Sequence, residues 1–201
     1  MTLYKNRQKF EKISIIIGRF FSKFGLTPNQ WTILTLLPTI IAFYFLLKQD
    51  FLIAALFFII SSFFDLVDGS IARVMGMVTK KGAYLDTIVD RYAEWMIITG
   101  LLFCDLPDFI LPIQFWLFVY LFGSVMTSYS KAAAKEKELV EKEIRGGLLE
   151  RAERLIILFI GILFAYFNKI YLTYIIVLLA ILSNITAIQR ILIAIKEKND
   201  F

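Results

Sequence analysis

Long runs of apolar residues, separated by short charged segments, constrain the fold of this chain more than any other feature. Of its 201 residues, 59% are hydrophobic, whereas a soluble domain has about 45–50% apolar residues. A helix needs about 20 apolar residues to cross roughly 30 Å of hydrocarbon. The runs predict six such helices, at about residues 27–48, 51–75, 82–104, 108–135, 148–167 and 170–195. The predicted fold is therefore all-α, a polytopic membrane protein with six transmembrane helices.

The first 26 residues follow a different pattern. Basic residues are scattered among apolar residues that recur at helical spacing, namely Phe10, Ile13, Ile16, Ile17, Phe20, Phe21 and Phe24. No compact apolar core precedes a small-residue cleavage site, as a cleavable signal peptide requires. We predict an amphipathic helix in the membrane interface. With no linker of domain type, residues 1–201 are expected to form one domain, with an interfacial helix at 1–26 and a six-helix bundle at 27–201.

The sequence Thr27-Pro28-Asn29-Gln30 marks the start of the first span. Thr27 can cap the helix, Pro28 suits its first position, and Gln30 completes a capping box.

Basic residues are concentrated on one side of the predicted bundle. They gather in the N-terminal segment, in the loop with Arg73, Lys80 and Lys81, in the stretch 131–154, and at the C-terminus with Lys196 and Lys198. The opposite connections, near residues 48–50, 104–108 and 168–169, carry little charge. Both termini are therefore expected in the cytoplasm. This bias accounts for the net charge of +5, so no nucleic-acid partner is expected.

The chain contains no histidine and a single cysteine, Cys104. An intrachain disulfide is thus impossible, and histidine-based triads or metal ligands are excluded. Any acid–base or metal chemistry must use carboxylates.

Four aspartates have a spacing that brings them together. Asp65 and Asp68 are about 60° apart around the second predicted span, and Asp86 and Asp90 are about 40° apart around the third. Both pairs lie near the cytoplasmic ends of adjacent antiparallel helices, so their faces can meet. A single Asp at a helix centre costs about 2.5–3.5 kcal/mol in a membrane, and less toward the ends. Two divalent ions, Mg²⁺ or Mn²⁺, would relieve this cost and could neutralise a diphosphate.

Small residues accompany the aspartates. Gly69 and Ala72 share the helix quadrant of Asp65 and Asp68, and Gly82 precedes Asp86 by one turn. They leave a slot for a ligand close to the backbone, and Arg73 can bind a phosphate bidentately.

Each of these positions also has a purely structural interpretation. A lone aspartate near a helix end is often solvated or paired with a basic residue, and glycine in a membrane helix is often a packing residue. For the whole set, the main alternative is an ion-coupled transporter, although no broken-helix inverted repeat favours it. A non-catalytic membrane scaffold is a further alternative.

The spaced set Asp65-x2-Asp68-Gly69-x2-Ala72-Arg73-x8-Gly82-x3-Asp86-x3-Asp90 resembles the signature of the CDP-alcohol phosphotransferases, with all eight positions filled. The resemblance also includes the six spans, the preceding interfacial helix and the Thr-Pro-Asn turn.

The resemblance implies that a CDP-linked lipid donates its phosphoalcohol group to an acceptor hydroxyl and releases CMP. It implies metal binding by Asp65, Asp68 and Asp86, with Asp90 as general base and further ligand. It also implies a homodimer. The residues expected around the CDP group are Thr27, Pro28, Asn29, Asp68, Gly69, Ala72, Arg73 and Gly82.

Three further basic residues indicate which kind of acceptor the enzyme uses. Lys131, Arg151 and Arg190 lie near the cytoplasmic ends of the fourth, fifth and sixth spans, where they can form a pocket for a phosphorylated alcohol. Arg154 could replace Arg151, and simple positive-inside anchoring is the alternative for each. The run Gly146-Gly147-x2-Glu150-Arg151-x-Glu153-Arg154 is similar to the inositol-phosphate-using branch of the family. We therefore expect inositol 1-phosphate as acceptor, ahead of glycerol 3-phosphate and then serine.

Overall fold

The computed structural model describes residues 7–140 and 146–197, and side chains within 12–140 and 146–196. Every regular element in these ranges is helical, which confirms the all-α prediction. The elements are α1 (Arg7–Phe21), η2 (Ser22–Phe24), α2 (Pro28–Leu34), α3 (Leu36–Leu47), α4 (Phe51–Val74), α5 (Lys80–Leu102), α6 (Ile113–Glu136), α7 (Arg151–Ala165) and α8 (Lys169–Glu197). Lys5, Glu141, Lys142, Glu143, Arg145 and Lys198 lie outside the described residues.

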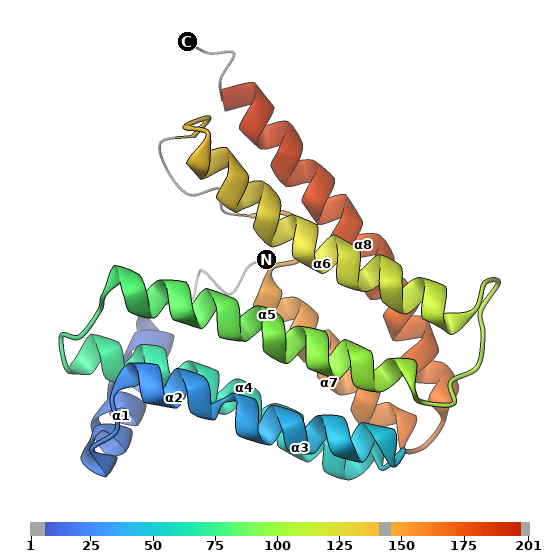
Figure 1. Cartoon of the computed structure of the whole chain (residues 1–201), viewed down its shortest axis with the longest axis horizontal. Coiled ribbons are helices and arrows are strands. Elements are labelled where there is room, and N and C mark those ends of the chain that lie inside the picture. Colours follow the sequence, from blue (N-terminus) through green and yellow to red (C-terminus); the bar gives the residue numbers. More distant parts are fainter. Residues whose placement is uncertain (1–6, 141–145, 198–201) are drawn as a thin grey trace.

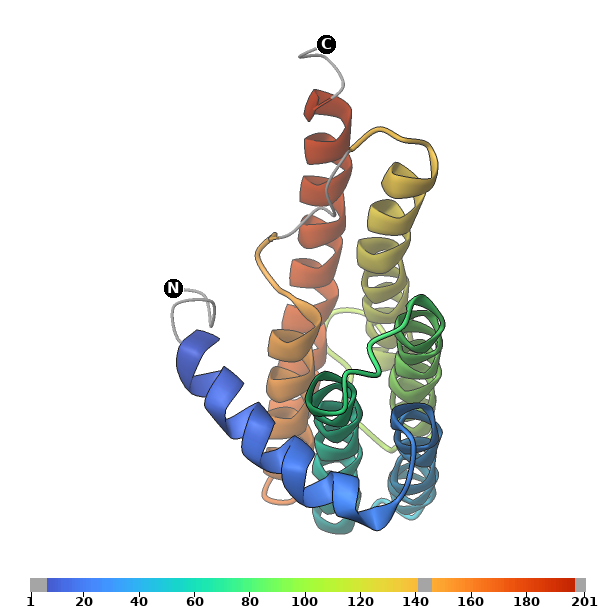
Figure 2. The same ribbon diagram turned by 90° about the vertical axis from the view of Figure 1, so that its left-hand side faces the viewer.

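The helices form a bundle whose turns gather at two ends (Figure 1). The α4–α5 turn and the start of α2 lie at one end, and the α3–α4, α5–α6 and α7–α8 turns lie at the other. At this second end, Lys169 Nζ donates to Gln49 Oε1 at 2.6 Å. Helix α1 runs obliquely across α4 at the first end (Figure 2). All the predicted site residues therefore lie toward the end that α1 covers or in the adjoining halves of α6 and α8.

The first predicted span begins as its sequence indicates. Thr27 Oγ1 accepts from Gln30 N at 3.3 Å, and Gln30 Oε1 accepts from Thr27 N at 2.8 Å, so the predicted capping box is confirmed. The span is divided between α2 and α3 at Thr35. Pro38 lies four residues after Leu34 and has no N–H to donate to its carbonyl, which accounts for the interruption.

Two of the helices begin later than the sequence predicted. The segment before α6 was expected to be helical from residue 108, but α6 begins at Ile113. Pro107 and Pro112 bracket this segment, and Asp108 Oδ1 instead accepts from Ile113 N at 2.9 Å. Helix α7 begins at Arg151 rather than residue 148.

The late start of α7 has a local cause. Gly146 and Gly147 have φ of 102° and 112°, values that L side chains rarely adopt. Glu150 then caps the helix, forming a capping box with Glu153. This places Arg151 in the first turn of α7.

The bundle has an apolar core and an apolar outer surface. The main core includes Leu46, Phe58, Ile98, Leu117 and Ile162, all buried. The outward faces also carry large apolar side chains, including Leu37, Leu56, Phe118, Phe122, Tyr174 and Ile181. Among the described residues, three helical segments are long and apolar enough to cross a membrane: Pro28–Leu47, Phe51–Val74 and Lys169–Lys196. An apolar exterior on such helices is what hydrocarbon requires.

Candidate active site

Three of the four aspartates form one cluster between α4 and α5. Each of Asp65, Asp68 and Asp86 offers a carboxylate oxygen, and these oxygens lie within 4.8 Å of one another. Asp68 is buried, whereas Asp65 and Asp86 are half-buried. The helical spacing of the aspartates thus does bring side chains from two helices together.

The cluster suits a hard divalent cation. Ligand oxygens lie about 2.0–2.6 Å from Mg²⁺, Mn²⁺ or Ca²⁺, so oxygens on opposite sides of one ion are about 4–5 Å apart. The spacing within the cluster matches that range, and the donor set is entirely carboxylate. The residues present therefore fit a divalent metal site.

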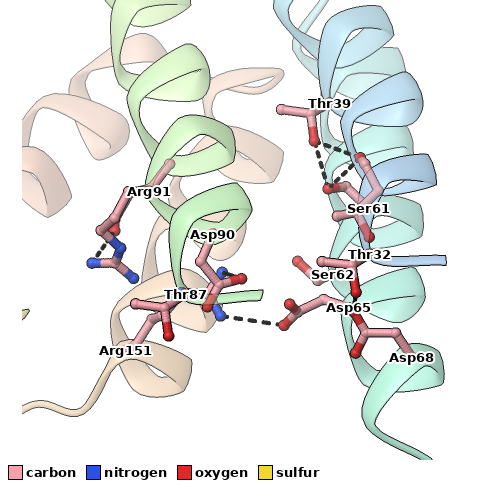
Figure 3. A network of polar contacts seen from close by, with 12 residues as sticks. Thr32, Thr39, Ser61, Ser62, Asp65, Asp68, Thr87, Asp90, Arg91 and Arg151 are labelled. Atoms are coloured by element: carbon pink, nitrogen blue, oxygen red, sulfur yellow. Dashed lines mark hydrogen bonds and ion pairs between the residues drawn. The ribbon is translucent and has the colours of Figure 1, made fainter. Parts of the chain in front are cut away.

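Thr32 on α2 contacts Asp68, the most buried carboxylate of the cluster. Its Oγ1 lies 2.5 Å from Asp68 Oδ2 and 3.1 Å from the carbonyl oxygen of Pro28, and Figure 3 shows the threonine directed at the carboxylate. The side chain lies one turn after the Pro28-Asn29 start of α2. Thr32 was not among the site residues predicted from the sequence, because only the tertiary contact between α2 and α4 gives it a role.

We predict that Thr32→Val weakens the affinity for Mn²⁺ by about 10–100-fold, because hydrogen-bond partners of metal ligands typically contribute that much. Titration of the purified protein with Mn²⁺, followed by electron paramagnetic resonance, measures the change. Thr35→Val is the matched control, since Thr35 Oγ1 likewise bonds to a backbone oxygen of α2, that of Trp31. Equal Mn²⁺ affinity in the two variants would contradict this role.

The fourth aspartate has a different neighbour. Asp90 Oδ1 lies 2.6 Å from Arg151 Nη2, and Arg151 Nη1 lies 3.2 Å from Asp65 Oδ2. Arg151 therefore bridges the two aspartate-bearing helices from the first turn of α7 (Figure 3). It supplies a counter-charge directly to Asp65 and Asp90.

A groove beside the cluster holds most of the residues predicted to contact CDP. It encloses about 740 Å³, part of it open to solvent. Its lining includes Pro28, Asn29, Asp68, Gly69, Ala72, Arg73, Gly82 and Asp86. Thr27 caps the helix that presents Pro28 and Asn29. The groove thus runs from the small residues of α4 and α5 to the carboxylates.

Gly82 leaves little room for a side chain where α5 meets α2 at this groove. A Cβ at Gly82 would lie 3.1 Å from Asn29 Oδ1 and 3.1 Å from Thr79 Oγ1. Thr79 Oγ1 also accepts from Gly82 N at 3.0 Å and so caps α5. A larger residue at Gly82 would displace the Asn29 side chain.

Thr127 on α6 accepts hydrogen bonds from Arg190 of α8 and Arg154 of α7. Arg190 Nη1 donates to the Thr127 carbonyl oxygen at 2.8 Å, and Lys131 follows Thr127 by one turn. Arg154 Nη1 donates to Thr127 Oγ1 at 3.3 Å, and Arg151 precedes Arg154 by one turn. The ends of α6, α7 and α8 are thereby joined at a single residue.

The Gly146-Gly147 segment also belongs to this region. Arg190 Nε donates to the Gly146 carbonyl oxygen at 3.1 Å. Leu149 N donates to Thr186 Oγ1 at 3.1 Å, and a Cβ at Gly147 would lie 2.5 Å from Thr186 Cγ2. These contacts hold the start of α7 against α8.

A buried ionic network lies behind the site, and Glu94 is at its centre. Glu94 Oε1 accepts from Ser124 Oγ at 2.6 Å, and Arg154 Nε lies 3.7 Å from the same oxygen. Glu94 Oε2 lies 3.0 Å from Arg91 Nη1, which also donates to Ser128 Oγ at 3.0 Å. Arg154 is only 1% exposed, so it points into the bundle while Arg151 reaches the aspartates.

The carboxylate cluster, which fits divalent metal ions, thus lies beside a groove in an all-helical bundle that has candidate membrane spans. The profile of the CDP-alcohol phosphatidyltransferase family matches residues 25–189. The chain belongs to this family, and it is an enzyme of the CDP-alcohol phosphatidyltransferase type.

Curated relatives are similar over nearly the whole chain. The archaetidylinositol phosphate synthase of Pyrococcus horikoshii is 36% identical over 189 residues, covering 94% of each chain. The phosphatidylinositol phosphate synthase of Mycobacterium tuberculosis is 32% identical over 202 residues, covering 94% of this chain and 88% of that protein.

Solved structures of the Mycobacterium tuberculosis enzyme share the fold. The structure with CDP-DAG bound has a TM-score of 0.77 at 30% identity, covering 91% of this chain and 94% of that one. The complex with manganese and citrate has a TM-score of 0.79 at 31% identity, covering 90% and 88%.

Proposed function

We propose that this enzyme transfers the phosphatidyl- or archaetidyl-type group of a CDP-linked lipid to the hydroxyl of inositol 1-phosphate, releasing CMP. The observation that carries the proposal is the continuity of the groove along α4 and α5 with the three-aspartate cluster. This continuity offers room for a nucleotide beside carboxylates that fit metal ions. The names of the two synthases above support the acceptor.

Within this proposal, Asp65, Asp68 and Asp86 hold Mg²⁺ or Mn²⁺ as two ions, with Asp90 as a further ligand. Such ions, when bound, neutralise the diphosphate and the departing CMP. Gly69, Ala72 and Gly82 leave space for the cytidine nucleotide, and Thr27, Pro28 and Asn29 enclose it.

Arg73 holds the diphosphate, and Asp90 is the general base. The Asp90 carboxylate accepts the proton of the acceptor hydroxyl as the hydroxyl oxygen attacks the β-phosphorus. The bond from that phosphorus to the bridging oxygen breaks, and CMP leaves. The Arg151 guanidinium, 2.6 Å from Asp90 Oδ1, orients this carboxylate.

The acceptor phosphate is assigned to Lys131, Arg151 and Arg190. Two observations support this assignment: Arg151 contacts Asp65 and Asp90 directly, and Arg190 bonds to Thr127, one turn before Lys131 on α6. The buried Nε of Arg151 has no hydrogen-bond partner among the described residues, so it has a donor to spare for a phosphate oxygen.

The membrane arrangement is also part of the proposal. We assign six transmembrane spans, to α2 with α3, α4, α5, α6, α7 and α8, and we place α1 in the interface as an amphipathic helix. Both termini and the active site face the cytoplasm, in agreement with the distribution of basic residues. The chain is one membrane domain, and the enzyme is a homodimer.

An acceptor panel tests the proposed substrate. Purified enzyme is supplied with CDP-diacylglycerol or CDP-archaeol, and CMP release is measured with inositol 1-phosphate, glycerol 3-phosphate, serine or free inositol. We expect inositol 1-phosphate to give the highest kcat/KM. Free inositol should react about 10²–10⁴-fold more slowly, because it lacks two or more charge-assisted hydrogen bonds. A preference for glycerol 3-phosphate would identify that compound as the acceptor instead of inositol 1-phosphate. A preference for serine or free inositol would contradict the assignment of a phosphate pocket to this site.

A further inference from the structure

Helix α1 contacts the back of the proposed donor site through one face. Ser14, Ile17, Gly18 and Phe21 share this face, since they follow helical spacing. A Cβ at Gly18 would lie 2.5 Å from the Ser70 carbonyl oxygen, so only glycine allows α1 to approach α4 this closely. Figure 2 shows α1 crossing α4 at this end.

A chain of hydroxyl groups joins this contact to Arg73. Ser70 Oγ lies 2.7 Å from the Leu66 carbonyl oxygen and 2.9 Å from Ser14 Oγ. Because Ser70 has one hydroxyl proton and gives it to Leu66, it accepts from Ser14. Arg73 Nη2 then donates to Ser14 Oγ at 2.8 Å and to Ser70 Oγ at 3.4 Å.

The two serines hold Arg73 without using up its donors. Both bonds come from Nη2, whereas Nη1 lies 3.4 Å from the position of a Cβ on Gly69, at the lining of the groove. An arginine has five N–H donors in a planar fork. Fixing one nitrogen therefore orients the rest of the fork along the groove.

Apolar contacts anchor α1 independently of these hydroxyl groups. Ile17 and Phe21 pack on a small core formed by Trp31, Val67 and Ile71. The Phe21 and Trp31 rings lie 5.3 Å apart at 90°. Removal of the Ser14 hydroxyl should therefore leave α1 in place.

From these contacts we infer that Ser14 is a positioning residue for donor binding: with Ser70, it orients the Arg73 guanidinium toward the diphosphate of the CDP-linked lipid. The N-terminal helix thereby forms part of the donor site, although none of its described side chains lines the groove. The inference rests on the part of the proposed function that places Arg73 beside the diphosphate.

Steady-state kinetics of Ser14→Ala test this role. We expect the KM for CDP-diacylglycerol to rise about tenfold, which corresponds to one hydrogen bond to a charged group, while kcat and the acceptor KM change less than twofold. Ser14→Thr keeps the hydroxyl and should restore the donor KM. Ser22→Ala is the matched control on the adjoining η2, where Ser22 Oγ bonds only to the Arg19 carbonyl oxygen among the described residues.

A double-variant cycle separates positioning from general stability. If Ser14 acts through Arg73, Ser14→Ala should add nothing to the donor KM of Arg73→Ala. Additive effects, or an unchanged donor KM in Ser14→Ala, would overturn the inference.

Equilibrium binding of CDP gives a readout that does not depend on turnover. Ser14→Ala should raise the Kd for CDP about tenfold and leave the Kd for cytidine unchanged, and equal Kd values for CDP in Ser14→Ala and wild type would overturn the inference. Failure of the proposed function has a different signature, because the wild-type enzyme would then release no CMP from the CDP-linked lipid.

Discussion

Asp90→Asn should lower kcat for CMP release by about 10²–10⁴-fold, the usual contribution of a positioned general base. Asparagine keeps the shape of the side chain and an oxygen that can accept from Arg151 Nη2, now 2.6 Å from Asp90 Oδ1. It cannot take up the proton of the acceptor hydroxyl. Because Asp65, Asp68 and Asp86 form their own cluster, Mn²⁺ binding should be largely retained.

Asp105→Asn is a suitable control for this experiment, because Asp105 lies at the opposite end of the bundle, 3.8 Å from Lys169 Nζ. It should have near wild-type kcat and Mn²⁺ affinity. Near-normal turnover by Asp90→Asn would show that Asp90 is not the general base. Loss of Mn²⁺ binding together with turnover would instead assign Asp90 mainly to the metal.

Glu94→Ala should destabilise the protein by about 3–5 kcal/mol, since it leaves a buried arginine without its counter-charge. Glu94 is 3% exposed and Arg154 is 1% exposed. The loss also removes the acceptor for Ser124 Oγ. Unfolding in detergent, followed by tryptophan fluorescence across a denaturant series, measures the change in free energy.

The double variant Glu94→Met with Arg154→Met provides the matched comparison. Replacing both partners of a buried ion pair by apolar residues is often neutral or stabilising. The double variant should therefore recover part of the stability lost in Glu94→Ala, because no unpaired Arg154 remains buried, while Arg91 keeps its bond to Ser128 but loses the Glu94 carboxylate. A loss for the double variant as large as that for Glu94→Ala would show that the ion pair is not the source of the effect.

Local patterns in the sequence predicted much of the fold and the centre of the site. The capping box at Thr27 depends on residues three apart and was predicted correctly. The aspartates at spacings of three and four share helix faces, and the cluster of Asp65, Asp68 and Asp86 is the tertiary consequence. Both features follow from the geometry of a single helix or of two neighbouring helices.

Features that depend on competing local signals were harder to predict. Apolar residues after position 108 favoured a helix, but Pro107 and Pro112 bracket the segment and the Asp108 side chain bonds to Ile113 N. Similarly, the glycines at 146 and 147 were interpreted from the sequence only as part of a run typical of the family. Their positive φ values delay the start of α7.

Roles that depend on contacts across helices were not predicted from the sequence. Thr32 matters because α2 lies against α4, where its hydroxyl meets Asp68. Glu94 continues the four-residue spacing of Asp86 and Asp90 along α5, but its role depends on Ser124 and Arg154, which α6 and α7 bring to it. Ser14 reaches Arg73 only because Gly18 allows α1 to approach α4. Each of these roles requires the packing of distant segments.

Metal-dependent release of CMP is the decisive test of the proposed reaction. Purified enzyme in liposomes receives a CDP-linked lipid and inositol 1-phosphate, and CMP and the phospholipid product are both quantified with and without Mg²⁺ or Mn²⁺. The predicted result is equimolar CMP and product that require both the metal and the acceptor, and that disappear in Asp86→Ala. Cation flux across the liposomes without CMP release would contradict the account and favour a transporter.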